Sequence, residues 1–133
     1  WHRFGIRAGS GGSGRWAGGC GNEYDFSVEV PTDLSILGDQ SITPPAGVHG
    51  GRPGAPNKVE YQVNGQWRQP ERGVKVAKVR LQPGDRVRMF SPGGGGFGNP
   101  TERDPNAIAR DVQRELLTAE QATERYPTEE TLR

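Results

Sequence analysis

The sequence is poor in apolar residues. Hydrophobic side chains make up 31% of its 133 residues, and no apolar run approaches the ~20 residues that a membrane-spanning helix needs. A chain of this length holds one domain at most, and this composition buries little apolar surface for each residue that becomes ordered. Three Trp, three Tyr and four Phe are nevertheless present, which is atypical of a disordered chain. We therefore expect an ordered chain that packs against other polypeptides.

Cysteine and net charge are also scarce. Cys20 is the single cysteine, so an internal disulfide framework is excluded. The 17 basic and 16 acidic residues nearly balance, whereas a nucleic acid or an anionic membrane calls for clustered positive charge. No segment has the charged-then-apolar layout of a signal peptide. We expect a cytoplasmic protein that has neither a nucleic acid nor a membrane as its partner.

Glycine and proline are abundant instead. The 21 glycines and 11 prolines together reach roughly twice the usual combined share of about 12%. Residues 7–21 (RAGSGGSGRWAGGCG) have no apolar periodicity, and residues 43–57 (TPPAGVHGGRPGAPN) contain too many breakers for a regular ladder. Both segments are expected to be loop or extended, polyproline-II-like backbone.

Several short segments have the alternation of β-strands. Residues 23–30 (EYDFSVEV) alternate apolar and polar side chains with the period of a half-buried strand, and residues 34–37 form a second short strand. Residues 74–81 and 86–90 are predicted to pair with each other across a type II turn at 82–85, in which Gly84 takes a positive φ. The alternation slips between Val76 and Val79, which indicates a β-bulge near Ala77-Lys78.

A β-hairpin is predicted around Asn64-Gly65. A two-residue type I′ loop would pair Gln62 with Trp67 and place the indole on the polar face, whereas a three-residue loop would pair Tyr61 with Trp67. We expect the three-residue loop, because it keeps the indole with the apolar side chains.

The last third of the sequence is helical in character. Asp104 suits an N-cap followed by Pro105 at the first helical position, and the helix is expected to end near Leu117. Its apolar stripe consists of Ile108, Val112 and Leu116. A second short helix is predicted from a capping box of Thr118 and Gln121 to a stop at Pro127.

The predicted fold is mainly β, with two small sheets in a barrel-like or sandwich-like arrangement. Gly/Pro-rich extended, polyproline-II-like segments connect them, and a short α-helical tail follows. We place the β domain at residues 1–100 and the helical tail at residues 101–133.

Neither a catalytic residue nor a cofactor or metal site is assigned. Residues 9–14 and 93–98 both match G-x-G-x-x-G, but neither leads directly into a periodic helix, so the match to a nucleotide-binding loop is weak. His2, Cys20 and His49 do not fall at a ligand spacing known to form a metal site. No sequence feature predicts a lowered pKa for the Cys20 thiol, so it is interpreted as a small packed side chain.

The glycine tracts need a physical reason, because each ordered glycine loses more backbone entropy than alanine. Close approach of backbone to backbone, or to a neighbouring subunit, would supply it, and a flexible linker is the alternative. The residues expected to serve such packing or an interface are Gly11, Gly12, Gly14, Gly93, Gly94, Gly95, Gly96, Phe97 and Gly98.

Three blocks of sequence carry a family resemblance: SGGSGRWAGG, PPAGVHGGRPGAPN and LQPGDRVRMFSPGGGGFGNPTERDPNAIARDVQRELLTAEQA. In this order they resemble the C-terminal region of hydantoinase B/oxoprolinase proteins. The B-type subunit of that family is several times longer than this chain. The start at Trp1, without an initiator methionine, leaves open whether the chain is trimmed, partly disordered at its start or a fragment of a longer polypeptide. Whether it is a separately made small subunit or a C-terminal piece is also open.

The resemblance implies a part of an ATP-dependent N-methylhydantoinase, 5-oxoprolinase, related lactamase, or acetone or acetophenone carboxylase. It implies two partners: a hydantoinase A-type subunit that binds ATP, and the remainder of the B-type subunit. No cofactor is expected on this chain, whereas ATP, with a divalent metal as a further candidate, would belong to partner subunits. The role expected here is structural and interfacial.

Two other functions are alternatives to this role. A stand-alone carbohydrate-binding module would use Trp1, Trp16 and Trp67 to stack on sugars and would show an exposed aromatic strip. A Gly/Arg-type nucleic-acid binder is disfavoured, because the charge is nearly balanced.

With so little apolar content, the chain expressed alone is expected to aggregate or fold poorly, and co-expression with its large partners should rescue it. Thermal unfolding followed by circular dichroism checks this expectation. A cooperative transition of the isolated monomer would contradict it.

Overall fold

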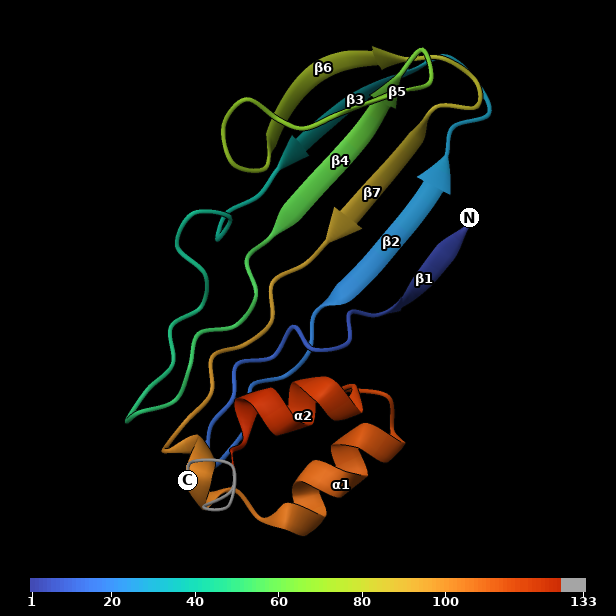
Figure 1. The fold of residues 1–133 in the computed structure, drawn as a ribbon. Helices are drawn as coiled ribbons and strands as arrows, with labels where there is room; N and C mark the ends of the chain where they lie inside the picture. Colours follow the sequence, from blue (N-terminus) through green and yellow to red (C-terminus); the bar gives the residue numbers. More distant parts are fainter. Residues whose placement is uncertain (128–133) are drawn as a thin grey trace.

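The large sheet organises the molecule. The computed structural model describes residues 1–127, and its five-stranded antiparallel sheet has the order β1-β2-β7-β4-β5 (Figure 1). The bounds of these strands are β1 Arg3–Ile6, β2 Asn22–Ser27, β7 Arg86–Phe90, β4 Lys58–Val63 and β5 Gln66–Arg68. A second antiparallel sheet pairs β3 (Thr32–Leu37) with β6 (Lys75–Leu81). The mainly β, two-sheet prediction is confirmed, without a closed barrel.

The core lies between the two sheets. Period-2 alternation turns one face of the large sheet toward the β3–β6 pair, as the strand patterns predict. The buried cluster consists of Val59, Tyr61, Val74, Val76, Leu81 and Val87. The core is therefore small, in keeping with the low apolar content.

The predicted pairing of residues 74–81 with 86–90 is wrong. β6 pairs with β3, whereas β7 pairs with β2 and β4, so the chain changes sheets at the turn between β6 and β7. The turn has the predicted positive φ at Gly84 (91°). The Gly84 amide donates to the Val28 carbonyl oxygen at 2.9 Å, and the Val28 amide donates to the Asp85 carbonyl oxygen at 3.0 Å. These bonds tie the turn to the end of β2 instead of closing a hairpin.

Asp85 holds this corner together. Its side chain is buried, with 3% of the residue exposed, and its carboxylate accepts the backbone amides of Gln82 (2.8 Å), Gly65 (2.8 Å) and Asn64 (3.3 Å). The amides of Gln82 and Gly65 hold the pKa of Asp85 below its ordinary value, although burial opposes this. One carboxylate thereby fixes the β6–β7 turn against the β4–β5 turn.

The prediction of a three-residue hairpin loop is also wrong. β4 and β5 are joined by the two-residue turn Asn64-Gly65, whose φ angles of 52° and 77° fit a type I′ turn, and Gln62 pairs with Trp67. The indole therefore lies on the polar face of the sheet. There the Arg88 guanidinium carbon stands 4.2 Å from the Trp67 ring centroid, a cation–π contact that makes the polar face acceptable for this aromatic side chain.

The predicted bulge in β6 is confirmed. Ala77 and Lys78 stand opposite the single residue Ser35, Lys78 has a φ of 50°, and its amide donates to the Ser35 hydroxyl at 3.1 Å. The bulge lets both Val76 and Val79 turn toward the core side.

The helical segment begins as predicted but ends earlier. Helix α1 spans Pro105–Gln113 with Asp104 as its N-cap, so the expected end near Leu117 is wrong by four residues. The chain reverses at Glu115 (φ 58°), which buries Leu117 and leaves the Leu116 carbonyl oxygen to accept the Gly9 amide at 2.8 Å. A short 3₁₀ helix, η1 (Pro100–Glu102), precedes α1.

The second helix follows its prediction. Helix α2 spans Ala119–Arg125 and has the capping box of Thr118 and Gln121, and it ends before Pro127. Residues 128–133 of the predicted tail lie outside the described residues, and the division of the chain at residue 100 stays a prediction. No helix in residues 1–127 has the length and apolar content that would let it cross a membrane.

Replacing Asp85 by Asn tests the corner. The substitution keeps the shape but removes the charge from a buried acceptor of three amides, so it should lower the free energy of unfolding by about 1–3 kcal/mol at neutral pH. Because folding lowers the pKa of Asp85, the carboxylate's contribution is present above the unfolded pKa of about 3.9 and is lost as the pH falls through the folded pKa. Urea unfolding of the assembled protein should show a smaller cost of Asp85→Asn at pH 3 than at pH 7.

Asp33→Asn is the matched control. Asp33 pairs with Arg80 at the surface, so its replacement should change stability by no more than about 0.5 kcal/mol. Equal effects of the two substitutions would contradict the role given to Asp85.

Candidate functional site

The glycine-rich segments form a bundle at one end of the large sheet. β2 begins after residue 21, β4 begins after residue 57 and β7 ends at residue 90, so three segments leave neighbouring strands at the same end. Figure 1 shows them running side by side, with α1 and α2 next to them. We call residues 9–21, 45–55 and 92–98 the glycine bundle.

Residues 93–98 run through the bundle and bond to both other segments. The Gly94 amide donates to the Gly19 carbonyl oxygen, and the Gly94 carbonyl oxygen accepts the Gly12 amide, both at 2.9 Å. On the other side, the Gly96 amide donates to the Arg52 carbonyl oxygen at 2.9 Å, and the Gly93 amide donates to that of Ala55 at 3.1 Å. The backbone polar groups are thus satisfied between segments without a regular sheet.

The bundle has space for backbone only. A Cβ atom on Gly93 would overlap the Ser10 carbonyl oxygen, and one on Gly95 would overlap that of Ala46. The same kind of overlap with backbone atoms faces Gly11, Gly12, Gly14 and Gly96. Gly94 is less confined, since its nearest neighbour would be the Gly19 amide nitrogen at 3.3 Å.

Phe97 and Gly98, the last two of the nine residues predicted to serve packing or an interface, lie at the outer end of the bundle. The Phe97 backbone exchanges two hydrogen bonds of 2.9 Å with Trp16, while its ring meets the His49 ring edge-on at 5.0 Å between centroids. Gly98 has a φ of 76°, and a Cβ there would lie 3.0 Å from the Arg15 Cβ. All nine predicted residues therefore lie in one structure, and their part in an interface stays a prediction.

Both G-x-G-x-x-G stretches are inside this bundle. Amides of Gly12, Gly93, Gly94 and Gly96 already donate to backbone carbonyl oxygens, and α1 begins only at Pro105. A phosphate-binding loop needs free amides at a helix N-terminus, so these two glycine stretches do not have the arrangement of such a loop.

Arg7 joins the bundle to the sheet. Its amide donates to the Gly21 carbonyl oxygen at 2.8 Å, and its guanidinium donates to those of Pro56 (2.7 Å) and Ser91 (3.0 Å). These three acceptors lie where the three bundle segments meet their strands. Nearby, the buried Ser10 hydroxyl donates to the Arg7 carbonyl oxygen at 2.6 Å. Sequence reasoning missed Arg7, because its acceptors are backbone atoms up to 84 residues away.

A cleft of about 400 Å³ lies between the bundle and the helices. Ile6, Leu116 and Leu117 give it an apolar lining, and Cys20 lies at its wall with Sγ 3.9 Å from the Leu116 carbonyl oxygen. Arg103, with 10% of its side chain exposed, donates to Asp111 at 2.5 Å and closes one side. The two charged groups at its wall, Arg103 and Asp111, pair with each other, although the buried Arg103 Nε has no hydrogen-bond partner within residues 1–127.

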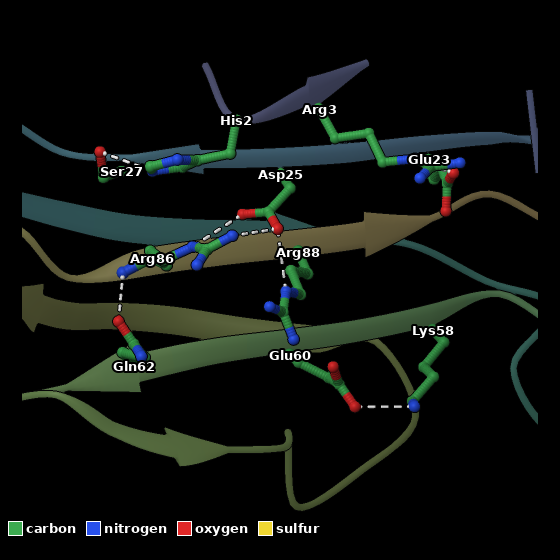
Figure 2. Close-up of polar contacts among 10 residues, drawn as sticks. All are labelled: His2, Arg3, Glu23, Asp25, Ser27, Lys58, Glu60, Gln62, Arg86 and Arg88. Carbon is green, nitrogen blue, oxygen red and sulfur yellow. Dashed lines mark hydrogen bonds and ion pairs between the residues drawn. The ribbon is translucent and has the colours of Figure 1, made fainter. Parts of the chain in front are cut away.

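The face of the large sheet that points away from the core carries paired charges (Figure 2). The Asp25 carboxylate accepts two bonds from Arg86 (3.0 and 2.5 Å) and one from Arg88 (3.0 Å). Burial works against its charge, but the hydrogen bonds from the two arginines hold the pKa of Asp25 below its ordinary value. This carboxylate is stabilised as an ion and is poorly suited to act as a general base.

The metal candidates of the sequence do not meet. His2 contacts Ser27, His49 packs on Phe97, and Cys20 lies in the cleft. Within residues 1–127, no three His, Cys, Asp or Glu side chains come together as a metal site would require. The three tryptophans are also separate: Trp1 contacts Phe26, Trp67 lies under Arg88, and Trp16 bridges to Phe97.

The sequence of the chain matches the family described as Hydantoinase B/oxoprolinase over residues 1–100. It is 34% identical over 123 residues to an uncharacterised protein of Methanocaldococcus jannaschii, a match that covers 92% of this chain and 21% of that protein. It is 35% identical over 98 residues to 5-oxoprolinase 1 of Arabidopsis thaliana, covering 74% of this chain and 8% of the relative. A third relative, the beta subunit of the caprolactamase of Pseudomonas jessenii, is 27% identical over 131 residues, covering 94% and 22%.

Two solved structures share the fold. A nucleotide-free acetone carboxylase superposes with a TM-score of 0.76 at 24% identity, covering 92% of this chain and 20% of that one. The ATP-dependent caprolactamase from Pseudomonas jessenii gives a TM-score of 0.75 at 24% identity, covering 94% and 22%. The chain thus spans only about a fifth, or less, of the length of the proteins that it matches.

Replacing Gly95 by Ala tests the bundle packing. A Cβ at this position meets the Ala46 backbone, which has no flexible end to move away, so the substitution should cost about 1–3 kcal/mol of stability. Gly19→Ala is the matched control, because a Cβ there meets nothing within 4 Å and should change stability by no more than about 1 kcal/mol. Unfolding midpoints of the assembled variants measure both effects. A Gly95→Ala variant as stable as Gly19→Ala would contradict backbone packing as the reason for these glycines.

Proposed function

Because this chain belongs to the hydantoinase B/oxoprolinase family, we propose that it is a structural and interface part of a multi-subunit ATP-dependent enzyme. The reaction class is hydrolysis of a cyclic amide or carboxylation of a ketone. Two relatives, named as the beta subunit of a caprolactamase and as the B subunit of a putative D-/L-hydantoinase, support a place in the B-type subunit. A hydantoinase A-type partner would bind the ATP.

The observation that carries this proposal is the glycine bundle. Its amides donate to neighbouring backbone, and its carbonyl oxygens lie where side chains would otherwise stand. Such a bundle makes a stiff body without placing reactive side chains at its centre. A stiff body of this kind suits a domain that holds other domains in position.

Three carboxylates support the same role. Asp25 is bonded to two arginines, Asp111 to Arg103, and Asp85 to three backbone amides. Each of these carboxylates therefore holds neighbouring elements together and is not free to bind a substrate. The carbohydrate-binding alternative finds less support, because the three tryptophans face different surroundings instead of forming one platform.

The proposal predicts that substrate turnover, but not ATP binding, requires this chain. The enzyme is produced with and without it and assayed with ATP on hydantoin, 5-oxoproline and caprolactam, and on acetone with bicarbonate. ATP should bind to the A-type partner in both preparations, whereas turnover of one substrate class should require this chain. Full turnover without the chain, or micromolar ATP binding to the purified chain in calorimetry, would contradict the proposal.

A further inference from the structure

The outer strand β1 carries an apolar surface that residues 1–127 leave uncovered. Trp1 is 79% exposed, Phe4 67% and Ile6 54%. Single exposed apolar side chains are ordinary, but a group of them indicates an interaction surface. These side chains do form a group: ring centroids lie 5.2 Å apart for Trp1 and Phe26, and 5.1 Å apart for Phe4 and Tyr24.

This surface continues into the cleft beside the helices. Ile6 lies two residues beyond Phe4 on the same face of β1, and it also lines the cleft together with Leu116 and Leu117. We call Trp1, Phe4, Ile6, Tyr24 and Phe26 the aromatic edge. It forms one apolar band that runs along β1 from the sheet to the cleft.

The backbone of β1 is also open to pairing. β1 ends the strand order of the sheet, so no strand within residues 1–127 pairs with its outer side. The Arg7 amide donates toward β2, to the Gly21 carbonyl oxygen. Because amides alternate in direction along a strand, those of Phe4 and Ile6 point outward. An open apolar edge is a template for an added strand.

The other edge of the sheet is built differently. β5 has three residues, all exposed, and its Trp67 is covered by the Arg88 guanidinium. A short polar edge discourages pairing. The two edges therefore differ, and of the two only β1 combines an open backbone with a grouped apolar face.

We infer that β1 receives an extended segment from the remainder of a hydantoinase B-type polypeptide, which adds a strand to the sheet. Apolar side chains of that segment cover the aromatic edge and enter the cleft. The matched solved chains contain about four-fifths of their length outside the part that this chain covers, which is the material available to pack here. Arg3 and Glu23 lie on the opposite, charged face of the sheet and pair with each other there, so the segment that covers the aromatic edge should be apolar rather than charged (Figure 2). This inference rests on the proposed function.

The first test is a substitution in the aromatic edge. The remainder of the B-type polypeptide is co-produced with this chain as a separate polypeptide, and the dissociation constant of the complex is measured by dilution. Phe4→Asp should weaken the complex about tenfold or more, because it removes a buried ring and buries a charge. Leu37→Asp, at an equally apolar position of β3 that is 86% exposed, should leave it within about twofold.

The second test needs no substitution. In the wild-type assembly, hydrogen exchange of the Phe4 and Ile6 amides should be as slow as in the interior strand β7, whereas the β5 amides that face solvent should exchange quickly. Equal effects of Phe4→Asp and Leu37→Asp, or exchange at Phe4 and Ile6 as fast as at β5, would overturn the inference and leave the proposed function standing. A wild-type chain that does not associate with the B-type remainder would contradict the proposed function itself.

Discussion

Direct contact between backbones in the glycine bundle is the constraint on which the rest of the structure depends. Residues 93–98 touch both neighbouring segments through carbonyl oxygens and amides, at distances that leave no space for a Cβ atom at most of these glycines. Ordering so many glycines is entropically expensive. Hydrogen bonds and dense backbone packing offset that cost, so a chain with 31% hydrophobic residues can still be ordered.

The sheet and the bundle fix each other. Strands β2, β7 and β4 enter the bundle from the same end, and Arg7 bonds to all three segments where they leave. At the opposite end of the sheet, the Asp85 carboxylate accepts amides from both the β4–β5 turn and the β6–β7 turn. The small apolar core between the sheets is thus held at both ends by hydrogen bonds to backbone. This arrangement leaves the aromatic edge of β1 as the main uncovered apolar surface of the large sheet within residues 1–127.

Local patterns in the sequence predicted local structure well. The N-cap Asp104, the capping box of Thr118 and Gln121 and the bulge at Ala77-Lys78 depend on neighbouring residues, and all three are present. The pairing of β6 with β3 could not be read in this way, because a turn sequence does not say whether the chain stays in one sheet. The hairpin register was mispredicted because the partner of Trp67 is Arg88, a residue of another strand. For the candidate site, glycine spacing indicated close packing, whereas the pairs of Asp25 with Arg86 and Arg88 join residues more than 60 positions apart.

Hydrogen exchange within residues 93–98 tests the central claim most directly, since the backbone acceptors of these amides are known one by one. In the assembled protein, the amides of Gly93, Gly94 and Gly96 should exchange as slowly as those of strand β7, because each donates to a backbone carbonyl oxygen of a neighbouring segment. Exchange of these three amides at the rate of an unstructured glycine linker would show that the bundle is not held together by its backbone.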